Sequence, residues 1–420
     1  MRKVKKAIKR KLLKYGKKHH TFLTLLRKTM FVWGRVQYLN YYYSNKVDDK
    51  MVMFEAYMGR YFVCSPKAIY NAMQNDERCS DYKYVWAFKN PDDFKYLEEN
   101  KNTVVVKYGS RQYYRYHAAA KYWVTNSRLK EIIKKKDNQV YIQCWHGTPL
   151  KKLGYDISVK GGNAMNSIND IRKKYKTDSK RYTYMISPSA FCTEKFASAF
   201  DLEDKSILKE TGYPRNDFLY NYTQQDVAEI KDRLGIKDDR KIILYAPTWR
   251  DDQHKAGMGY VYKAQMDFDK MQREFGDEYI ILFRTHYFVA NYIDLSKYEG
   301  FVYNVSTYDD INDLYIISDL LITDYSSVFF DYSNLKRPIY FYMYDFDEYK
   351  NNLRDFYIDL SELPGPITKT QDELMDELKN ISTYESRYRE IYDKFNARFT
   401  YLEDGQSSQR VVKQCILNEA

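Results

Sequence analysis

A short apolar segment of this chain ends in residues that could transfer a proton and bind an anion. Residues 140–144 have the pattern of a buried strand, and His146, Gly147 and Thr148 follow it. Lys151 comes next, after a proline that suits the first turn of a helix. An imidazole, a hydroxyl group, backbone N–H groups and an ammonium group therefore lie in one short stretch, which is typical of a site for an anionic ligand.

A second histidine follows a second apolar strand. Residues 279–284 end in Arg284, and His286 comes two residues later. The guanidinium group of Arg284 could hold a phosphate. Either imidazole could accept a proton at neutral pH, because an unperturbed histidine titrates at about pH 6.5. The plainer alternative for each is a structural histidine that is hydrogen-bonded at the end of a strand. For His146, the polar and basic neighbours favour a role in catalysis over this alternative.

Hydroxyl groups gather at the end of a third apolar strand, residues 320–323. Asp324 follows this strand, and Ser326 and Ser327 come at the start of a predicted helix. A serine hydroxyl and backbone N–H groups at such a position could bind a diphosphate. Ser326 or Ser327 would also be the N-cap of this helix, a position where serine is common and needs no ligand, so this segment alone is a weak signal.

Three further arginines are candidates for anion binding. Thr248 and Arg250 follow the predicted strand 241–246, where an anion would lie if the strands share one sheet edge. Arg215 lies in a turn-rich segment that could be only a connection between two domains. Arg410 lies at the polar start of a C-terminal helix.

Several common patterns are missing from the sequence. No glycine-rich dinucleotide loop, P-loop or Asp-x-Asp metal pair appears where a nucleotide or metal would require it. We therefore expect neither a dinucleotide dehydrogenase nor metal-dependent phosphoryl transfer of the kinase type, and we expect no cofactor or metal. The five cysteines are widely spaced and odd in number, which fits a reducing cytoplasm.

The positive charge of the chain is concentrated at its N-terminus. Of 68 Lys and Arg residues, 14 lie in residues 1–47, which contain no acidic residue. The rest of the chain has 54 basic and 57 acidic residues and a net charge of −3. A nucleic-acid-binding protein would spread its basic residues over a folded face, so we do not expect nucleic acid as a partner.

Apolar residues recur at helical spacing within this basic arm. They include Val4, Ile8, Leu12 and Tyr15. A basic amphipathic helix of this kind lies well on an anionic membrane surface, whereas a solvated, disordered tail would lack the apolar stripe. Arg27 and Lys28 interrupt the longest nearby apolar stretch, so no membrane-spanning helix and no signal peptide is expected.

After the arm, predicted strands alternate with predicted helices in two series. This alternation predicts an α/β protein with two doubly wound parallel sheets whose ligand cleft lies at the carboxyl ends of the strands. We expect an amphipathic arm over residues 1–47, an N-terminal domain over 48–218 and a C-terminal domain over 219–420. The C-terminal helices could cross back onto the first half.

The order of the motifs resembles that of the CDP-glycerol glycerophosphotransferase family, the teichoic acid primases and polymerases of Gram-positive bacteria. The resemblance covers roughly residues 50–415 and rests on residues 146–151, 212–217, 245–250, 284–286 and 323–327. Residues 404–410 resemble a further motif, with Ser407 in place of the usual alanine. Each motif alone is weak, but five in this order are specific.

The resemblance implies a GT-B-like fold, a CDP-polyol donor and monotopic attachment to the cytoplasmic face of the cell membrane. It also implies that His146 and His286 match the two histidines that the family needs for activity. We assign the donor phosphates to Thr248, Arg250, Arg284, Asp324, Ser326, Ser327, Arg215 and Arg410. Gly147, Thr148 and Lys151 would lie on the acceptor side.

The expected reaction transfers glycerol phosphate from CDP-glycerol to a hydroxyl group of a lipid-linked (undecaprenyl-type) glycan or teichoic acid, with CMP as the leaving group. His146 is the preferred base, although exchanged roles with His286 stay open. The alternatives are the same chemistry with CDP-ribitol, a nucleotide-sugar glycosyltransferase, and a catalytically silent glycan-binding protein. The product length and the oligomeric state, including a homo-oligomer, stay open as well.

Overall fold

The computed structural model of the protein describes residues 20–157, 168–248, 254–255, 259–260, 265–285, 294–346 and 356–419. Two predicted site residues, Arg250 and His286, lie outside these ranges. Residues 1–19, which carry most of the basic residues of the N-terminal arm, lie outside them too.

The first domain is built on a parallel sheet of seven strands in the order β3-β2-β1-β4-β5-β6-β7. The strands are β1 (Asp48–Glu55), β2 (Lys83–Phe88), β3 (Thr103–Lys107), β4 (Ala120–Thr125), β5 (Val140–Gln143), β6 (Tyr184–Ser187) and β7 (Leu208–Glu210). Along β1, Met53 belongs to one apolar core and its neighbours Val52 and Phe54 to another. Because successive side chains of a strand point to opposite faces, the sheet is covered on both sides.

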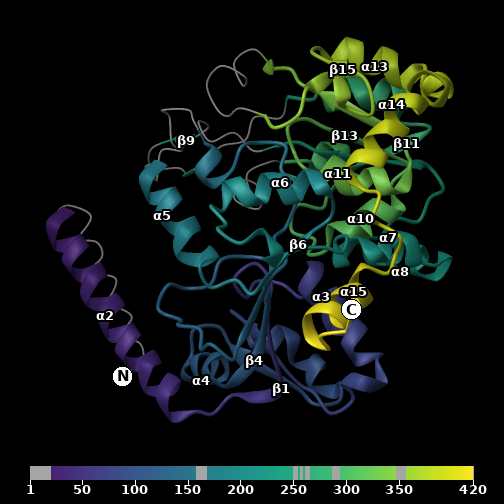
Figure 1. Ribbon diagram of the computed structural model, residues 1–420. Coiled ribbons are helices and arrows are strands. Elements are labelled where there is room, and N and C mark those ends of the chain that lie inside the picture. Colours follow the sequence, from purple (N-terminus) through teal and green to yellow (C-terminus); the bar gives the residue numbers. More distant parts are fainter. Residues whose placement is uncertain are drawn as a thin grey trace.

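Helices on the two faces provide this cover (Figure 1). They are α3 (Cys64–Gln74), α4 (Arg111–Ala119), α5 (Ile168–Ser179) and α6 (Ala190–Ala199). Ser189 caps α6 through a hydrogen bond from the amide of Cys192, as expected for serine before a helix. By contrast, α3 starts at Cys64 after Val63, whose side chain makes no capping hydrogen bond.

The second domain has a parallel sheet of six strands in the order β12-β11-β8-β13-β14-β15. The strands are β8 (Lys241–Ala246), β11 (Tyr279–Phe283), β12 (Val302–Asn304), β13 (Leu320–Thr323), β14 (Ile339–Tyr342) and β15 (Ile367–Thr368). A separate two-stranded ladder joins β9 (His254–Lys255) and β10 (Gly259–Tyr260). All residues of β11 and β13 are buried, which explains their continuous apolar sequence.

Helices accompany this second sheet as well. They are α7 (Phe218–Asn221), α8 (Gln224–Arg233), α9 (Phe268–Phe275), α10 (Ile311–Ile317), α11 (Val328–Tyr332), α13 (Gln371–Lys379) and α14 (Tyr384–Phe399). The two domains face each other across the middle of the molecule (Figure 1). The prediction of two parallel-sheet α/β domains is therefore confirmed, while β7, β12 and β15 were too short to be recognised in the sequence.

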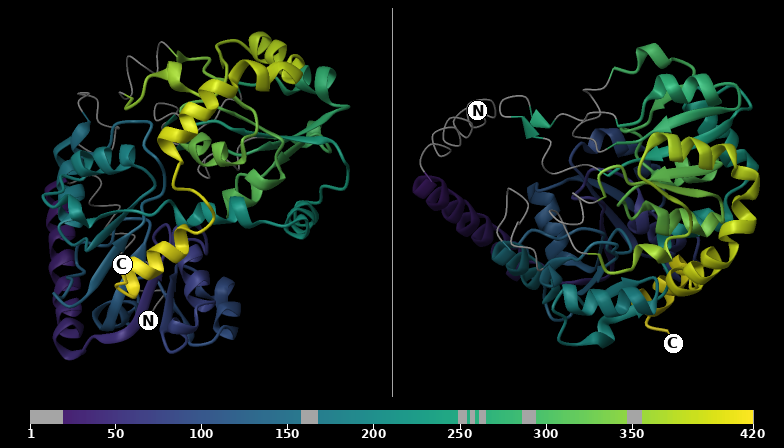
Figure 2. Two further views of the ribbon diagram at one scale, coloured as in Figure 1. Left: turned by 45° about the vertical axis from the view of Figure 1, so that its right-hand side comes forward. Right: turned by 90° about the horizontal axis from the view of Figure 1, so that it is seen from above.

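The C-terminal segment leaves the second domain and returns to the first (Figures 1 and 2). Here α15 (Ser407–Val411) and the π-helical turn Val412–Ile416 pack beside α3, and the Tyr122 hydroxyl donates to the Ile416 carbonyl at 2.8 Å. The Asp217 carboxylate accepts the amides of Ser407 and Ser408 at 2.8 and 2.7 Å. The last helices therefore tie the connection between the domains to the first sheet.

The helix α2 (His20–Ser44) lies along the edge of the first domain (Figures 1 and 2). One side of it is anchored, because the Arg35 guanidinium and the Tyr38 hydroxyl donate to the carbonyls of Ile132 and Lys134, each at 2.8 Å. The other side carries exposed large apolar side chains, namely Leu25, Val32, Trp33, Val36 and Tyr43. Within the described parts of the chain, no helix has the length and hydropathy needed to cross a bilayer.

Replacing Arg410 by Ala should destabilise the fold. Its guanidinium donates to the Asp404 carboxylate and to the carbonyls of Thr211 and Leu402, so it joins the C-terminal turn to the end of the first domain. We expect the free energy of unfolding in urea to fall by about 2–3 kcal/mol, the usual cost of losing hydrogen bonds to a charged group. Lys413→Ala, an exposed change in the same segment, is the control, and equal stability of the two variants would contradict this role.

Candidate active site

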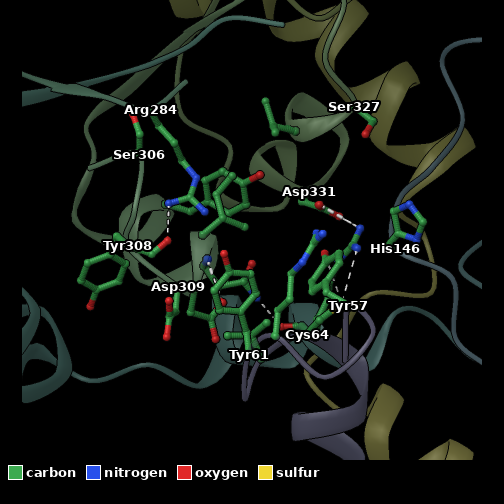
Figure 3. Close-up of a pocket in the computed structure, with 18 of the residues that line it drawn as sticks. Tyr57, Tyr61, Cys64, His146, Arg284, Ser306, Tyr308, Asp309, Ser327 and Asp331 are labelled. Atoms are coloured by element: carbon green, nitrogen blue, oxygen red, sulfur yellow. Dashed lines mark hydrogen bonds and ion pairs between the residues drawn. The ribbon is translucent and has the colours of Figure 1, made fainter. Parts of the chain in front are cut away.

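A pocket of about 440 Å³ lies between the two domains (Figure 3). The first domain contributes Tyr57, Arg60, Tyr61, Cys64 and His146, and the second contributes Arg284, Thr285, Ser306, Tyr308, Asp309, Ser327 and Asp331. In Figure 3, His146 and Arg284 lie at opposite sides of this pocket. Its walls are therefore polar and aromatic, with basic groups from both domains.

The pocket lies at the carboxyl ends of the strands in both sheets. In the first sheet the strand order reverses between β1 and β4, and the residues that follow these strands include Tyr57 and Asn126. In the second sheet the reversal falls between β8 and β13, and Thr248 and Asp324 follow these strands. Crevices at such reversal points are where open α/β sheets bind ligands.

A left-handed residue directs His146 toward the pocket. Trp145 has a φ of +51°, and its amide donates to the Gln143 side chain at 2.9 Å. Its indole packs edge-on against Phe200, with ring centroids 4.8 Å apart. The chain therefore reverses sharply after β5, and this sharp turn is held by a buried amide and an aromatic contact.

The imidazole of His146 has a defined tautomer. Its Nδ1 lies 2.8 Å from the backbone carbonyl of Asn126. A carbonyl oxygen can only accept a hydrogen bond, so Nδ1 carries the proton and Nε2 carries the lone pair of the neutral ring. The Tyr57 ring stands edge-on to this imidazole at 5.9 Å.

The environment of His146 keeps it neutral. The side chain of His146 is exposed at the pocket, but the protein around it displaces bulk water, and this desolvation lowers the pKa of His146 to about 4. The nearby guanidinium groups of Arg215 and Arg128 lower the pKa further, whereas the bond to Asn126 raises it. At neutral pH the ring is therefore uncharged, and its Nε2 lone pair is available to accept a hydrogen bond.

The turn after β1 has an unusual backbone. Tyr57, Met58 and Gly59 have successive φ values of +46°, +57° and +73°. A Cβ on Gly59 would come within 2.9 Å of the Ala87 carbonyl, so this position requires glycine. The amides of Tyr57 and Met58 donate to the side chains of Asn126 and Ser127 at 2.8 and 3.1 Å.

Arg284 presents a fixed cation on the opposite wall. Its Nη1 donates to the carbonyls of Val305 and Tyr308 at 3.1 and 2.7 Å. Burial lowers its pKa, yet a guanidinium stays charged at neutral pH. In the described part of the chain it forms no ion pair with a carboxylate, so its charge can act on an anion in the pocket.

Arg215 lines the pocket and also joins the two domains. Its guanidinium is buried and donates to both carboxylate oxygens of Asp331, at 2.7 and 2.9 Å. The Asn312 side chain, also from the second domain, donates to the Arg215 carbonyl. Arg215 therefore lines the pocket, but its charge is largely matched by Asp331 and it connects the two domains.

Gly147 and Ser327 meet across the domain boundary. A Cβ on Gly147 would lie 3.0 Å from the Ser327 hydroxyl oxygen, which is closer than most such contacts. Ser327 occupies the residue before α11, but its hydroxyl makes no capping hydrogen bond to that helix. Its side chain instead lines the pocket, as predicted for a ligand-binding serine, although not as the predicted cap.

The other predicted residues lie around this centre. The Asp324 carboxylate is buried and accepts the Thr248 amide at 2.7 Å, so it holds the ends of β8 and β13 together. Ser326 is half-buried, and Thr148 is buried. Lys151 pairs with Phe356 of the second domain in an isolated β-bridge.

Arg410 is not brought to the pocket. Its three guanidinium nitrogens donate to Asp404, Thr211, Leu402 and Ser407, in the C-terminal segment and at the end of the first domain. The pocket-lining residues do not include it. These bonds give Arg410 a structural role, and its part in binding a diphosphate stays a prediction.

Several pocket residues were missed in the sequence. They are Tyr57, Arg60, Tyr61, Cys64, Thr285, Ser306, Tyr308, Asp309 and Asp331, together with Asn126 behind His146. Tyr57 and Asn126 directly follow predicted strands, so the rule that led to His146 could have indicated them. Asp331 lies within a helix and gave no such signal. Among the residues with described side chains, no cluster of His, Cys, Asp and Glu could hold a metal ion.

Comparison with known proteins places this geometry among related enzymes. A family model described as CDP-glycerol:poly(glycerophosphate) glycerophosphotransferase matches residues 38–417. The chain is 42% identical to a teichoic acid poly(glycerol phosphate) polymerase of Staphylococcus epidermidis over 88% of its length, but it spans only half of that protein. It is 40% identical to the polymerase of the same description from Bacillus spizizenii, covering 88% of this chain and 92% of the relative.

A solved structure also matches the fold. The wall teichoic acid polymerase TagF superposes with a TM-score of 0.82 at 39% identity. The match covers 93% of this chain and 94% of the solved chain. The prediction of the family and of its two-domain GT-B-like architecture is confirmed by these matches.

The pKa of His146 can be measured directly. In NMR titrations its ring protons should titrate below the ordinary value of about 6.5, because the protonated form is disfavoured in the pocket. Arg128→Gln removes one nearby cation and should raise the midpoint by up to about one pH unit. The signals are assigned by their loss in His146→Asn. A midpoint at or above the ordinary value would contradict this account of the site.

Proposed function

The chain belongs to the CDP-glycerol:poly(glycerophosphate) glycerophosphotransferase family, and from that membership we propose that it transfers glycerol phosphate from CDP-glycerol to a hydroxyl group of a lipid-linked teichoic acid acceptor and releases CMP. The observation that carries the proposal is the neutral His146, held with Nε2 unprotonated, in a pocket that Arg284 lines from the other domain. A base and a fixed cation on facing walls suit attack by a hydroxyl group on a phosphate.

In the proposed step the acceptor hydroxyl oxygen forms a bond to the phosphorus that carries glycerol. The bond from that phosphorus to the bridging oxygen breaks, and its electron pair leaves with CMP. The hydroxyl proton passes to Nε2 of His146, whose Nδ1–H stays bonded to Asn126. The scheme includes no cofactor, because proton transfer and fixed charge supply what the step needs.

Arg284 would stabilise the donor diphosphate in this scheme. Its guanidinium is held by two carbonyls and needs no reorganisation when an anion arrives. The Ser327 hydroxyl lines the same pocket and could donate to a phosphate oxygen. Arg250 and His286 lie outside the described residues, and we propose from the sequence that Arg250 binds the diphosphate and His286 supports the transferring phosphate or the leaving group.

We propose further that the enzyme is a peripheral protein of the cytoplasmic membrane face and that α2 contributes to the contact. The anchored side of α2 leaves Trp33 and Val36 exposed, with exposed fractions of 66% and 60%. An apolar helix face next to a basic segment suits the boundary of an anionic bilayer. This placement would bring the enzyme to a lipid-linked acceptor.

Replacing His146 by Ala should reduce CMP release by at least about 100-fold, because the variant lacks the proposed base. Binding of CDP, measured by calorimetry, should stay close to that of the wild type. CMP release is measured with CDP-glycerol and a lipid-linked acceptor, and CDP-ribitol in parallel identifies the polyol. Near-normal turnover by the variant would remove His146 from the role of base, and UDP release from a nucleotide sugar would favour a glycosyltransferase.

Placing aspartates on the exposed face of α2 should release the protein from membranes. The triple change Val32→Asp, Trp33→Asp and Val36→Asp adds three negative charges where apolar contact with the membrane is proposed. These substitutions are preferable to deleting residues 1–47, because the deletion would also remove the buried Tyr38. Sedimentation with phosphatidylglycerol vesicles should fall by at least about tenfold. Ile367→Asp, an exposed site in the second domain, is the control, and equal pelleting of the triple variant would rule out α2 as the contact.

A further inference from the structure

Asn126 contacts two separate parts of the pocket at once. It is fully buried directly after β4. Its backbone carbonyl accepts the hydrogen bond from His146, and its side-chain Oδ1 accepts the amide of Tyr57, each at 2.8 Å. His146 follows β5 and Tyr57 follows β1, and both are distant from Asn126 in the sequence. Asn126 therefore connects the ends of β1, β4 and β5.

The backbone around Asn126 is fixed on both sides. The Thr125 hydroxyl bonds to the carbonyl of Ser127 at 3.1 Å and accepts its amide at 3.2 Å. The Thr125 carbonyl accepts the amide of Cys144, next to the histidine segment, at 2.8 Å. The direction of the Asn126 carbonyl is therefore set independently of any ligand.

The side chain of Asn126 holds a turn that would otherwise relax. Tyr57 and Met58 both have positive φ, which residues with a Cβ rarely adopt. The hydrogen bond from the Tyr57 amide to Asn126 compensates for this conformation and places the Tyr57 ring against the imidazole of His146. Loss of this acceptor would let the turn move, and the Tyr57 ring would move with it.

We propose that Asn126 is a positioning residue that fixes the tautomer and direction of His146 and holds the Tyr57 turn against it. The inference rests on the proposed function only for its effect on turnover, because the tautomer is a property of the protein without substrate. Asn126 acts through His146 and touches no reacting atom.

Aspartate at this position provides a matched variant. The Asn126 amide nitrogen is buried and has no hydrogen-bond partner among the described residues, so a carboxylate oxygen could replace it without loss of a bond. Asn126→Asp keeps the acceptor for the Tyr57 amide. It also adds a negative charge beside His146, which should raise the pKa of the imidazole. The other groups that face this imidazole are the guanidinium groups of Arg215 and Arg128 and the phenol of Tyr57.

The experiment combines NMR of ¹⁵N-labelled histidine with the pH dependence of kcat, for the wild type, Asn126→Ala, Asn126→Asp and Ser127→Ala. In the wild type the Nδ1–H tautomer of His146 should dominate. In Asn126→Ala the backbone carbonyl is retained, so the tautomer should persist. Loss of the acceptor for the Tyr57 amide should change the shifts of the His146 ring protons and lower kcat about 10- to 100-fold, with KM for CDP-glycerol changed by less than about threefold. Asn126→Asp should keep the tautomer, with the acid limb of the profile moved to higher pH.

Ser127→Ala is the control, because it removes a bond to the same turn without a contact to His146. It should leave the tautomer and the acid limb unchanged. The proposal is overturned if the wild type has the Nε2–H tautomer, if Asn126→Ala leaves the His146 ring-proton shifts unchanged, or, where that variant does not fold, if Asn126→Asp leaves the acid limb unmoved. If the wild type releases no CMP, the proposed function fails, and the tautomer measurement still decides the role of Asn126.

Discussion

The buried ion pair between Arg215 and Asp331 joins the two domains at the floor of the pocket, and the geometry of the site depends on it. Both groups are removed from water, and the pair is stabilised because one guanidinium nitrogen donates to both carboxylate oxygens and because Asn216 also donates to the carboxylate. Removing one partner would leave a buried charge, at a cost of about 3–5 kcal/mol. The pair therefore sets the distance across which residues of the two domains face each other.

The two walls that this pair holds together differ in their electrostatics. On one wall, desolvation and nearby cations keep His146 neutral. On the other, Arg284 is held by carbonyl groups and carries a charge that no carboxylate within the described residues neutralises by an ion pair. A neutral base and a fixed cation are complementary to a hydroxyl nucleophile and an anionic donor, and each depends on its environment for that state.

The C-terminal segment supports this arrangement from outside the pocket. It returns to the first sheet beside the connection between the domains, where Asp217 accepts the amides of Ser407 and Ser408 and Arg410 donates to the Thr211 carbonyl. Residues near the end of a chain therefore stabilise the segment that contains Arg215. The motif around Arg410 has this structural role.

The sequence by itself determined the alternation of strands and helices, the two parallel sheets and the position of His146 at a strand end. These follow from local periodicity, because buried parallel strands are continuously apolar and polar residues that follow them collect at one edge. Only the tertiary structure decided that Arg215 pairs with Asp331, 116 residues away, that Ser327 meets Gly147, and that Asn126 holds His146. Such contacts depend on how the two domains face each other, and no local pattern of residues encodes that distance.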